Sequence, residues 1–211
     1  MSGSFFGANA DLVASITNLG IDYVVVSDIV FESLSALDNS QGVLAIVSKL
    51  QSVMSASDVG FDLAKVSQLS HNCLYLDRIR DPGNMGTILR TAVACGFGLV
   101  FVDNCVDIYS QKVVRSAASA LYYLTIVHLN DIVSIKPFFK IFCTSPLGDS
   151  LFDMNLSDIK KCVVVGNEAS GIRKDILDVG DCTVSLPMYN TQSLNAAVAA
   201  SVIMYKLAFD I

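Results

Sequence analysis

Histidine, paired cysteines and long apolar runs are scarce in this 211-residue sequence, and each scarcity excludes a class of protein. With only two histidines, histidine-rich metal chemistry and a Ser-His-Asp triad are poorly supported. The six cysteines form no CxxC pair, which argues against a zinc ribbon or a redox motif. No run of about twenty apolar residues occurs, and the start resembles no signal peptide. We therefore predict a soluble cytoplasmic protein with no membrane contact and no metal.

Basic charge is also in short supply, and the acidic excess is uneven. The chain has 14 Lys and Arg residues against 20 Asp and Glu residues, a formal net charge of −6. Residues 1–70 hold seven of the acids and only two lysines. Because affinity for phosphates normally shows itself as a basic surface, charge alone does not indicate a nucleic-acid binder.

Apolar residues are abundant and indicate a well-packed protein. They make up 53% of the chain and charged residues 16%, which is far from the composition of a disordered segment. The length suits one medium α/β domain with a small additional domain. Four cysteines lie in or beside β-like apolar runs, where a reduced thiol is usually a small core residue: Cys73, Cys143, Cys162 and Cys182.

The order of apolar and polar segments predicts two domains. Residues 1–50 form a small domain with helices at 8–19 and 28–36 and strands at 21–27 and 42–48; residues 51–72 form a serine-rich linker; and residues 73–211 form the main domain. In the main domain apolar strands alternate with helices, which indicates an α/β fold with a parallel sheet covered on both faces.

Such a sheet binds its ligand beyond the carboxyl ends of its strands. Neither GxGxxG nor a Walker P-loop is present, so an ordinary dinucleotide or nucleoside triphosphate site is not expected there. Three other loops stand out, at 78–98, 163–172 and 186–205.

In the first loop, a Pro82-Gly83 turn precedes Asn84, which can cap the following helix. Arg90 stands in that helix among small and apolar residues, where an unpaired guanidinium would be costly to bury. A purely structural interpretation gives Arg90 a salt bridge to Asp77 or Asp103.

The other two loops combine glycines with isolated polar groups. Glycine at 166 and 171, after a strand, lets backbone approach a ligand closely. Ser193 can cap a final helix, Leu194 to Phe209, that is apolar nearly all round, and Asn195 within it must find a partner if buried.

Three patterns occur in a fixed order: N-x-G-x-x-x-R at 84–90, G-N-E-x-x-G at 166–171 and L-P-M followed by S-L-N at 186–195. Together they resemble the signature motifs of the SpoU/TrmH family of RNA ribose 2′-O-methyltransferases, in the SPOUT superfamily. The resemblance covers residues 73–211. A weaker likeness at 41–48 suggests the end of the family's small substrate-binding domain, shortened here, and favours rRNA over tRNA.

The resemblance implies a SPOUT fold whose carboxyl-terminal chain forms a deep trefoil knot. The alternation of strands and helices alone predicts an open doubly wound sheet instead. It also implies a homodimer and S-adenosylmethionine as cofactor. The residues it assigns to catalysis are Asn84, Arg90, Glu168, Ser193 and Asn195. Those it assigns to the cofactor are Gly166, Asn167, Leu186, Met188, Ser193 and Leu194. The substrate RNA would contact Arg90 and Arg115.

Two departures and two alternatives accompany the resemblance. Near Arg115 the family has a proline before the lysine and a glycine after the small residues, whereas this chain has Gln111 and Ala118 or Ser119. The small domain is short and acidic. A base-modifying SPOUT methyltransferase is one alternative, and a non-catalytic RNA-binding or assembly protein that retains the fold is the other.

Overall fold

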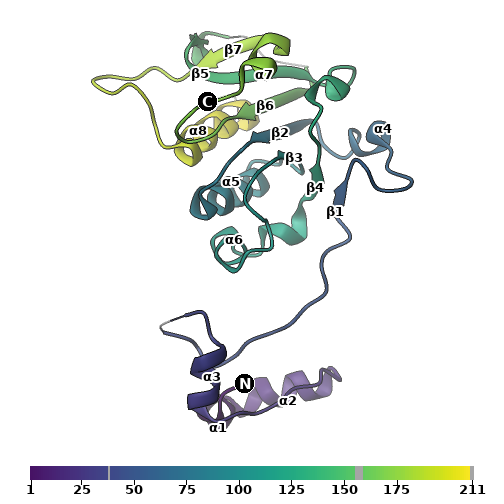
Figure 1. The fold of residues 1–211 in the computed structure, drawn as a ribbon, viewed down its shortest axis with the longest axis vertical. Coiled ribbons are helices and arrows are strands. Elements are labelled where there is room, and N and C mark those ends of the chain that lie inside the picture. The colour runs from purple at the N-terminus through teal and green to yellow at the C-terminus, as the bar shows by residue number, and fades with distance from the viewer. Residues whose placement is uncertain (38, 155–158, 210–211) are drawn as a thin grey trace. The chain divides into compact units, whose positions relative to one another are not determined.

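A computed structural model describes residues 1–37, 39–154 and 159–209 (Figure 1). The chain divides into two compact units, Met1–Lys49 and Leu50–Ile211. The stretch 51–72, predicted to link two domains, lies in the second unit and contributes the strand β1 and the helix α4 to it.

The first unit consists of three short helices, α1 (Gly3–Ala8), α2 (Ala10–Asn18) and α3 (Asp28–Leu34). Ser2 and Ser27 cap α1 and α3 with their hydroxyl oxygens. The strands predicted at 21–27 and 42–48 are wrong, because the described part of this unit has only an isolated bridge between Ser2 and Val26. β-branched residues favour strands, but a strand also requires a neighbour to pair with.

The second unit is built on a seven-stranded sheet in the order β1-β4-β3-β2-β6-β5-β7, and every neighbouring pair is parallel. The strands are β1 (Val53–Ser55), β2 (Asn72–Asp77), β3 (Leu99–Asp103), β4 (Thr125–His128), β5 (Lys140–Ser150), β6 (Lys161–Val165) and β7 (Cys182–Ser185). The predicted parallel α/β sheet is therefore confirmed, and its central strands are buried on both faces.

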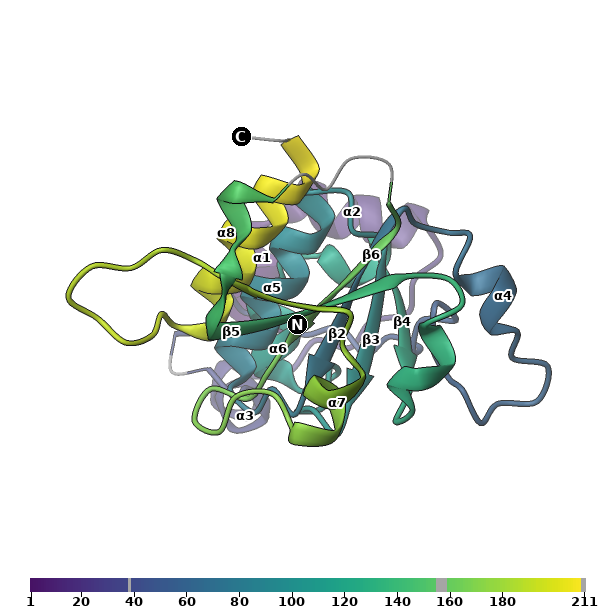
Figure 2. The same cartoon turned by 90° about the horizontal axis from the view of Figure 1, so that it is seen from above.

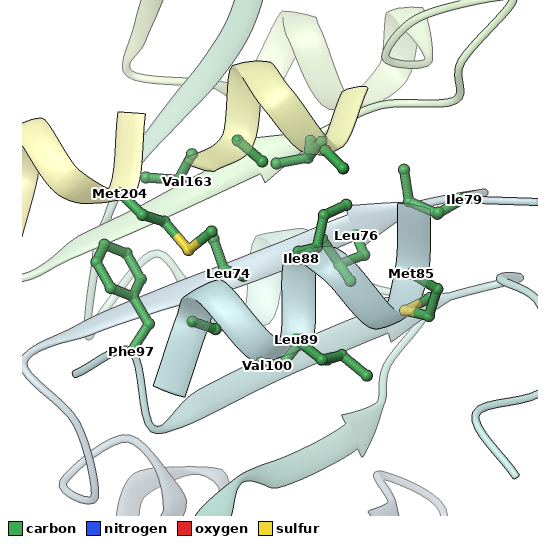
Figure 3. Close-up of a cluster of buried hydrophobic side chains, with 14 of the residues drawn as sticks. Leu74, Leu76, Ile79, Met85, Ile88, Leu89, Phe97, Val100, Val163 and Met204 are labelled. Carbon is green, nitrogen blue, oxygen red and sulfur yellow. The ribbon is translucent and has the colours of Figure 1, made fainter. Parts of the chain in front are cut away.

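Helices cover both faces of the sheet (Figure 2). On one face lie α5 (Pro82–Ala94), α6 (Gln111–Ala117) and α8 (Ala196–Phe209), which bury Leu74, Val100 and Val163 of the sheet. Figure 3 shows this core, where Met85, Ile88 and Leu89 of α5 pack on β2 and β3 beside Met204 of α8. On the other face lie α4 (Leu63–Val66), the 3-10 turn η2 (Ile132–Ile135) and α7 (Lys174–Val179).

The cysteines are reduced and mostly serve as core residues. All six are free, and Cys73, Cys143 and Cys162 are buried, while Cys182 is half-buried. Burial raises the pKa of the Cys143 thiol to about 12, so this thiol stays protonated and unreactive near neutral pH.

Helices α5 and α6 approach each other closely at Gly86, whose motif role is thus explained by packing. A Cβ atom there would overlap the side chain of Ser116 and lie 2.7 Å from the amide nitrogen of Ala117.

After α6, Ala118 and Ser119 adopt left-handed conformations with φ of 46° and 67°. The family that the sequence resembles has glycine at one of these two positions, Ala118 or Ser119, and a residue with a Cβ is strained in this conformation.

The final helix α8 is apolar but short. Among the described residues no helix is both long and apolar enough to cross a membrane.

Candidate active site

The first motif loop is held by a cap at Asp81. Its carboxylate accepts from the amide of Asn84 at 2.7 Å, and Pro82 occupies the first turn of α5. The prediction that Asn84 caps this helix is therefore wrong. The signal was present in the Asp-Pro pair, because proline is favoured just after an N-cap. As a result, the Asn84 side chain is available for other contacts.

Residues from all three motif loops meet at the Asn84 side chain. Its Nδ2 donates to Oε1 of Glu168 at 3.1 Å, and its Oδ1 accepts from Nδ2 of Asn195 at 2.9 Å. The three residues come from α5, the loop after β6 and the start of α8. This hydrogen-bonded group, Asn84, Glu168 and Asn195, is called the polar triad below.

Asn195 also caps α8. Its Oδ1 accepts from the amides of Ala197 at 2.9 Å and Val198 at 3.2 Å. The predictions that Ser193 is the cap and that Asn195 lies within the helix are therefore wrong, since α8 begins at Ala196. Ser193 lies instead on the wall of the adjoining pocket.

Glu168 is held as a carboxylate. Burial acts to raise its pKa, but hydrogen bonds from Asn84 and from the amides of Arg80 and Asp81 outweigh burial, so the pKa lies below its ordinary value. Glu168 therefore only accepts hydrogen bonds at neutral pH. It fixes Asn84 and its own loop, and none of its hydrogen bonds in the described structure comes from Arg90.

The loop carrying Glu168 closes on itself. Oδ1 of Asn167 accepts from the amides of Ala169 and Ser170, and the main chains of Asn167 and Gly171 bridge each other. A Cβ atom on Gly166 would overlap the backbone of Gly171 and Ile172 and lie 2.7 Å from Ile172 Cγ1. Gly166 thus makes room for the chain's own backbone at Gly171 and Ile172. The sequence predicted instead that this glycine makes room for a ligand.

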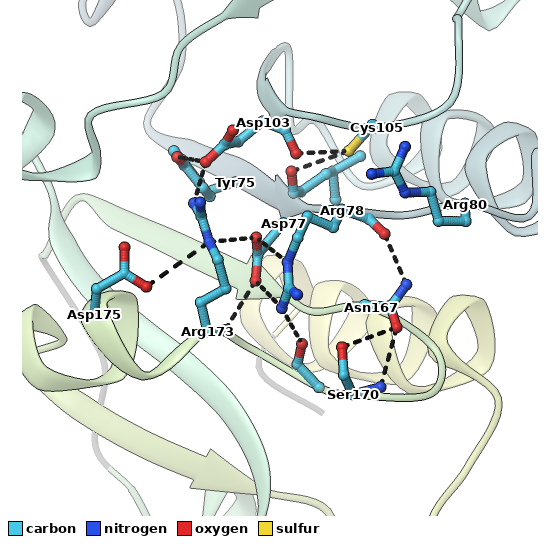
Figure 4. Close-up of polar contacts among 12 residues, drawn as sticks. Tyr75, Asp77, Arg78, Arg80, Asp103, Cys105, Asn167, Ser170, Arg173 and Asp175 are labelled. Carbon is cyan, nitrogen blue, oxygen red and sulfur yellow. Dashed lines mark hydrogen bonds and ion pairs between the residues drawn. The ribbon is translucent and has the colours of Figure 1, made fainter.

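Two buried aspartates anchor this loop to the sheet. Asp77 ends β2 and Asp103 ends β3, and the two are register partners. Arg173 binds both, with its Nε 3.0 Å from Asp77 and its Nη2 in contact with Asp103, which also accepts from the hydroxyl of Tyr75. Arg78 binds Asp77 through Nε at 3.0 Å (Figure 4). The alternative that pairs Arg90 with Asp77 or Asp103 is therefore excluded.

A pocket of about 400 Å³ opens beside the polar triad. All six residues predicted to bind the cofactor line it: Gly166, Asn167, Leu186, Met188, Ser193 and Leu194. The sequence missed two further walls, Thr144–Pro146 of β5 and Ala199, Ala200 and Ile203 of α8. The β5 wall belongs to a strand that continues to Ser150.

The pocket suits S-adenosylmethionine. Its volume lies in the usual range for small-molecule sites of roughly 300 to 1,000 Å³. Leu186, Leu194 and Ile203 provide apolar surface for an adenine ring, and Thr144, Asn167 and Ser193 provide polar groups. No group of three or more potential metal ligands occurs among the residues that the structure describes.

Arg90 and Arg115 are exposed on α5 and α6. Within residues 1–37, 39–154 and 159–209, neither guanidinium has a hydrogen bond or an ion pair. Arg90 is not part of the pocket wall, and the structure does not bring it into the polar triad. Both guanidiniums are therefore free to bind groups from outside this chain.

Comparison with known proteins identifies the family. The model of the SpoU rRNA Methylase family matches residues 71–205, which contain the polar triad and the pocket. The chain belongs to the SpoU rRNA Methylase family.

Individual relatives of this family match the same region. The chain is 30% identical over 141 residues to the 23S rRNA (guanosine(2553)-2′-O)-methyltransferase RlmP of Bacillus subtilis, covering 64% of this chain and 56% of that protein. It is 32% identical over 143 residues to the 23S rRNA (uridine(2479)-2′-O)-methyltransferase of Streptomyces viridochromogenes, covering 62% and 50%. The chain thus spans about half the length of these relatives.

Solved structures agree with the SPOUT α/β fold of the SpoU family. The SpoU methyltransferase AviRb of Streptomyces viridochromogenes in complex with AdoMet matches with a TM-score of 0.64 and 29% identity, covering 71% of this chain and 64% of that one. An rRNA methyltransferase of Sinorhizobium meliloti matches with a TM-score of 0.76, covering 95% and 76%, but at 21% identity this likeness shows the fold alone.

Proposed function

We propose that this protein transfers a methyl group from S-adenosylmethionine to a ribose 2′-hydroxyl of structured RNA, more readily rRNA than tRNA. The observation that carries the proposal is the junction of the pocket with the polar triad. Glu168 lines the pocket and also binds Asn84, so a cofactor in the pocket would lie against the triad. The 2′-O-methyltransferase activities named for RlmP and for the Streptomyces protein support the reaction, and both act on 23S rRNA.

The chain's own residues would contribute mainly by positioning. S-adenosylmethionine supplies an electrophilic methyl group when bound. Asn84, held by Glu168 and Asn195, would orient the ribose. Arg90 stays protonated and is a poor base, so its guanidinium would stabilise the developing alkoxide or hold the neighbouring phosphate.

Cofactor binding can be tested by filling the pocket. Ala199 of α8 is half-buried and lines the pocket. We expect Ala199→Leu to weaken S-adenosylmethionine binding about tenfold or more, because three added carbons occupy the ligand's space. Isothermal titration calorimetry measures this affinity directly.

The matched control is Ala94→Leu, the same change at an exposed position of α5. It should bind the cofactor as the natural protein does. Equal affinities in the two variants would remove the pocket assignment, and a natural protein that does not bind S-adenosylmethionine would overturn the proposed function.

We also propose the deep trefoil knot and the homodimer that the family resemblance implies. In support of the knot, β7 follows β6 in the chain but pairs with the far side of β5, so the connection from β6 to β7 crosses β5. In support of the dimer, Val198, Val202, Tyr205 and Phe209 are exposed at helical spacing on α8. A shallow apolar groove on the same helix is lined by Phe152, Val202 and Tyr205.

Light scattering should therefore give twice the chain mass of 22.6 kDa. We expect Val202→Glu to shift the mass to that of the monomer, because a buried unpaired carboxylate is costly. Val114→Glu places the same change on exposed α6 and should remain dimeric. A natural protein that is monomeric at micromolar concentration would contradict the dimer.

We propose a cytoplasmic location for the protein. We also propose that residues 1–50 serve as a small RNA substrate-binding domain. The likeness to the Sinorhizobium structure, which covers 95% of the chain, supports a related fold in this region.

A further inference from the structure

Arg78 adopts an unusual backbone conformation directly behind the active-site loops. It follows the last residue of β2 with a φ of 56°, in the left-handed region. Residues other than glycine, asparagine and aspartate rarely adopt this conformation, and strain of this kind persists only where surrounding contacts enforce it. The contacts at Arg78 explain why it is tolerated.

The Arg78 side chain connects the sheet to the pocket. Its Nε and Nη2 donate to the two carboxylate oxygens of Asp77, at 3.0 Å and 3.1 Å. The same Nη2 also donates to the carbonyl of Gly171 at 3.1 Å. Gly171 is a pocket residue, so one guanidinium joins a buried carboxylate to the pocket wall.

The Arg78 main chain contacts the other end of the same loop. Its carbonyl accepts from Nδ2 of Asn167 at 2.9 Å. Figure 4 shows Arg78 between Asp77 and this loop, with Arg80 apart from the group and drawn without contacts. Both ends of the turn that carries Glu168 are thus attached to a single residue of the first motif loop.

We propose that Arg78 is a positioning residue that holds the loop 166–171 in the shape that binds S-adenosylmethionine. This inference rests on the proposed function. An arginine suits the role because its planar fork can bind a carboxylate with two nitrogens and still donate to a carbonyl, whereas lysine offers one point charge.

The role is separable from stability because Asp77 has a second partner. Nε of Arg173 lies 3.0 Å from Asp77, and the amide of Arg173 donates to it at 2.9 Å. Loss of the Arg78 side chain therefore leaves Asp77 paired. The fold should persist while the loop loses its attachment at Gly171.

The experiment compares Arg78→Asn, Arg78→Lys and Arg80→Asn in the full chain. Asparagine tolerates the left-handed conformation, so Arg78→Asn removes the guanidinium without adding strain. We expect its affinity for S-adenosylmethionine, measured by calorimetry, to fall about tenfold with the melting temperature nearly unchanged. Arg78→Lys should recover part of the loss. Arg80→Asn is the control. It removes the same charge at a position two residues further along the chain, where the side chain has no described partner, and it keeps the main-chain amide that donates to Glu168.

Hydrogen exchange gives a second measurement that needs no cofactor. The amides of residues 167–171 should exchange about tenfold faster in Arg78→Asn than in the natural protein or in Arg80→Asn. Unchanged exchange, or an affinity loss matched by a general loss of stability, would overturn the inference. If the loop exchanges faster but the natural protein binds no S-adenosylmethionine, the proposed function fails and the cofactor role of Arg78 fails with it. If the natural protein binds and Arg78→Asn binds equally well, only the inference fails.

Discussion

Replacing Arg90 by alanine is expected to slow methyl transfer about a hundredfold or more, in line with the loss of one electrostatic stabiliser of a transition state. The melting temperature and the affinity for S-adenosylmethionine should change little. The structure gives the reason: the guanidinium is exposed, has no ion pair among the described residues, and lies outside the pocket wall. Its removal therefore leaves no buried charge unpaired.

The measurement is transfer of labelled methyl groups to RNA from cells that lack the protein. Arg90→Lys should recover little activity, because a point charge does not reproduce the planar two-pronged contact of a guanidinium. Near-normal turnover in a folded, dimeric Arg90→Ala variant would defeat the assignment.

Replacing Asp77 by alanine should strongly lower the stability of the fold, whereas Arg90→Ala should leave it nearly unchanged. Asp77 is completely buried and pairs with Arg78 and Arg173. Removing it leaves two guanidiniums facing each other without their shared carboxylate. Breaking a buried pair in this way costs about 3 to 5 kcal/mol, and we expect the lower end because both arginines are partly exposed. Urea denaturation followed by circular dichroism measures the free energy of unfolding.

Asp175→Ala provides the control for this change. Asp175 also lies near Arg173, at 3.8 Å, but its side chain is 73% exposed. An exposed pair contributes about 1 kcal/mol or less, so this variant should remain close to the natural protein. Equal losses in the two variants would show that Asp77 is not the central acceptor of this group.

The central strands of the sheet in the second unit were predictable because they are continuous apolar runs bounded by polar turns, whereas β1 lies in the stretch predicted as a linker. The run at 99–103 coincides with β3, since both faces of a central parallel strand are covered and little else explains such a run. The equally apolar segments at 21–27 and 42–48 do not form strands. Composition reports that a segment favours an extended conformation, but pairing depends on what lies beside it in space.

The sequence predicted which loops form the candidate site, but it did not predict which side chains contact one another there. The six residues predicted to bind the cofactor lie together because the second and third loops follow β6 and β7, two strands of one sheet. The sequence correctly marked Asp77 and Asp103 as partners for an arginine, but it offered Arg90, whereas Arg78 and Arg173 bind them. Arg173 is 96 residues from Asp77, and no local rule connects such a pair.

The polar triad has a fixed sense of direction. At one end, ionised Glu168 can only accept, so Asn84 must turn its nitrogen toward it and its oxygen toward Asn195. At the other end, the free amides of α8 can only donate, so Asn195 must turn its oxygen toward them and its nitrogen toward Asn84. The two ends dictate the same orientation independently. A carboxylate in place of either amide would have the right shape and would still leave an acceptor facing an acceptor, so this row of side chains admits asparagine at both positions and excludes aspartate.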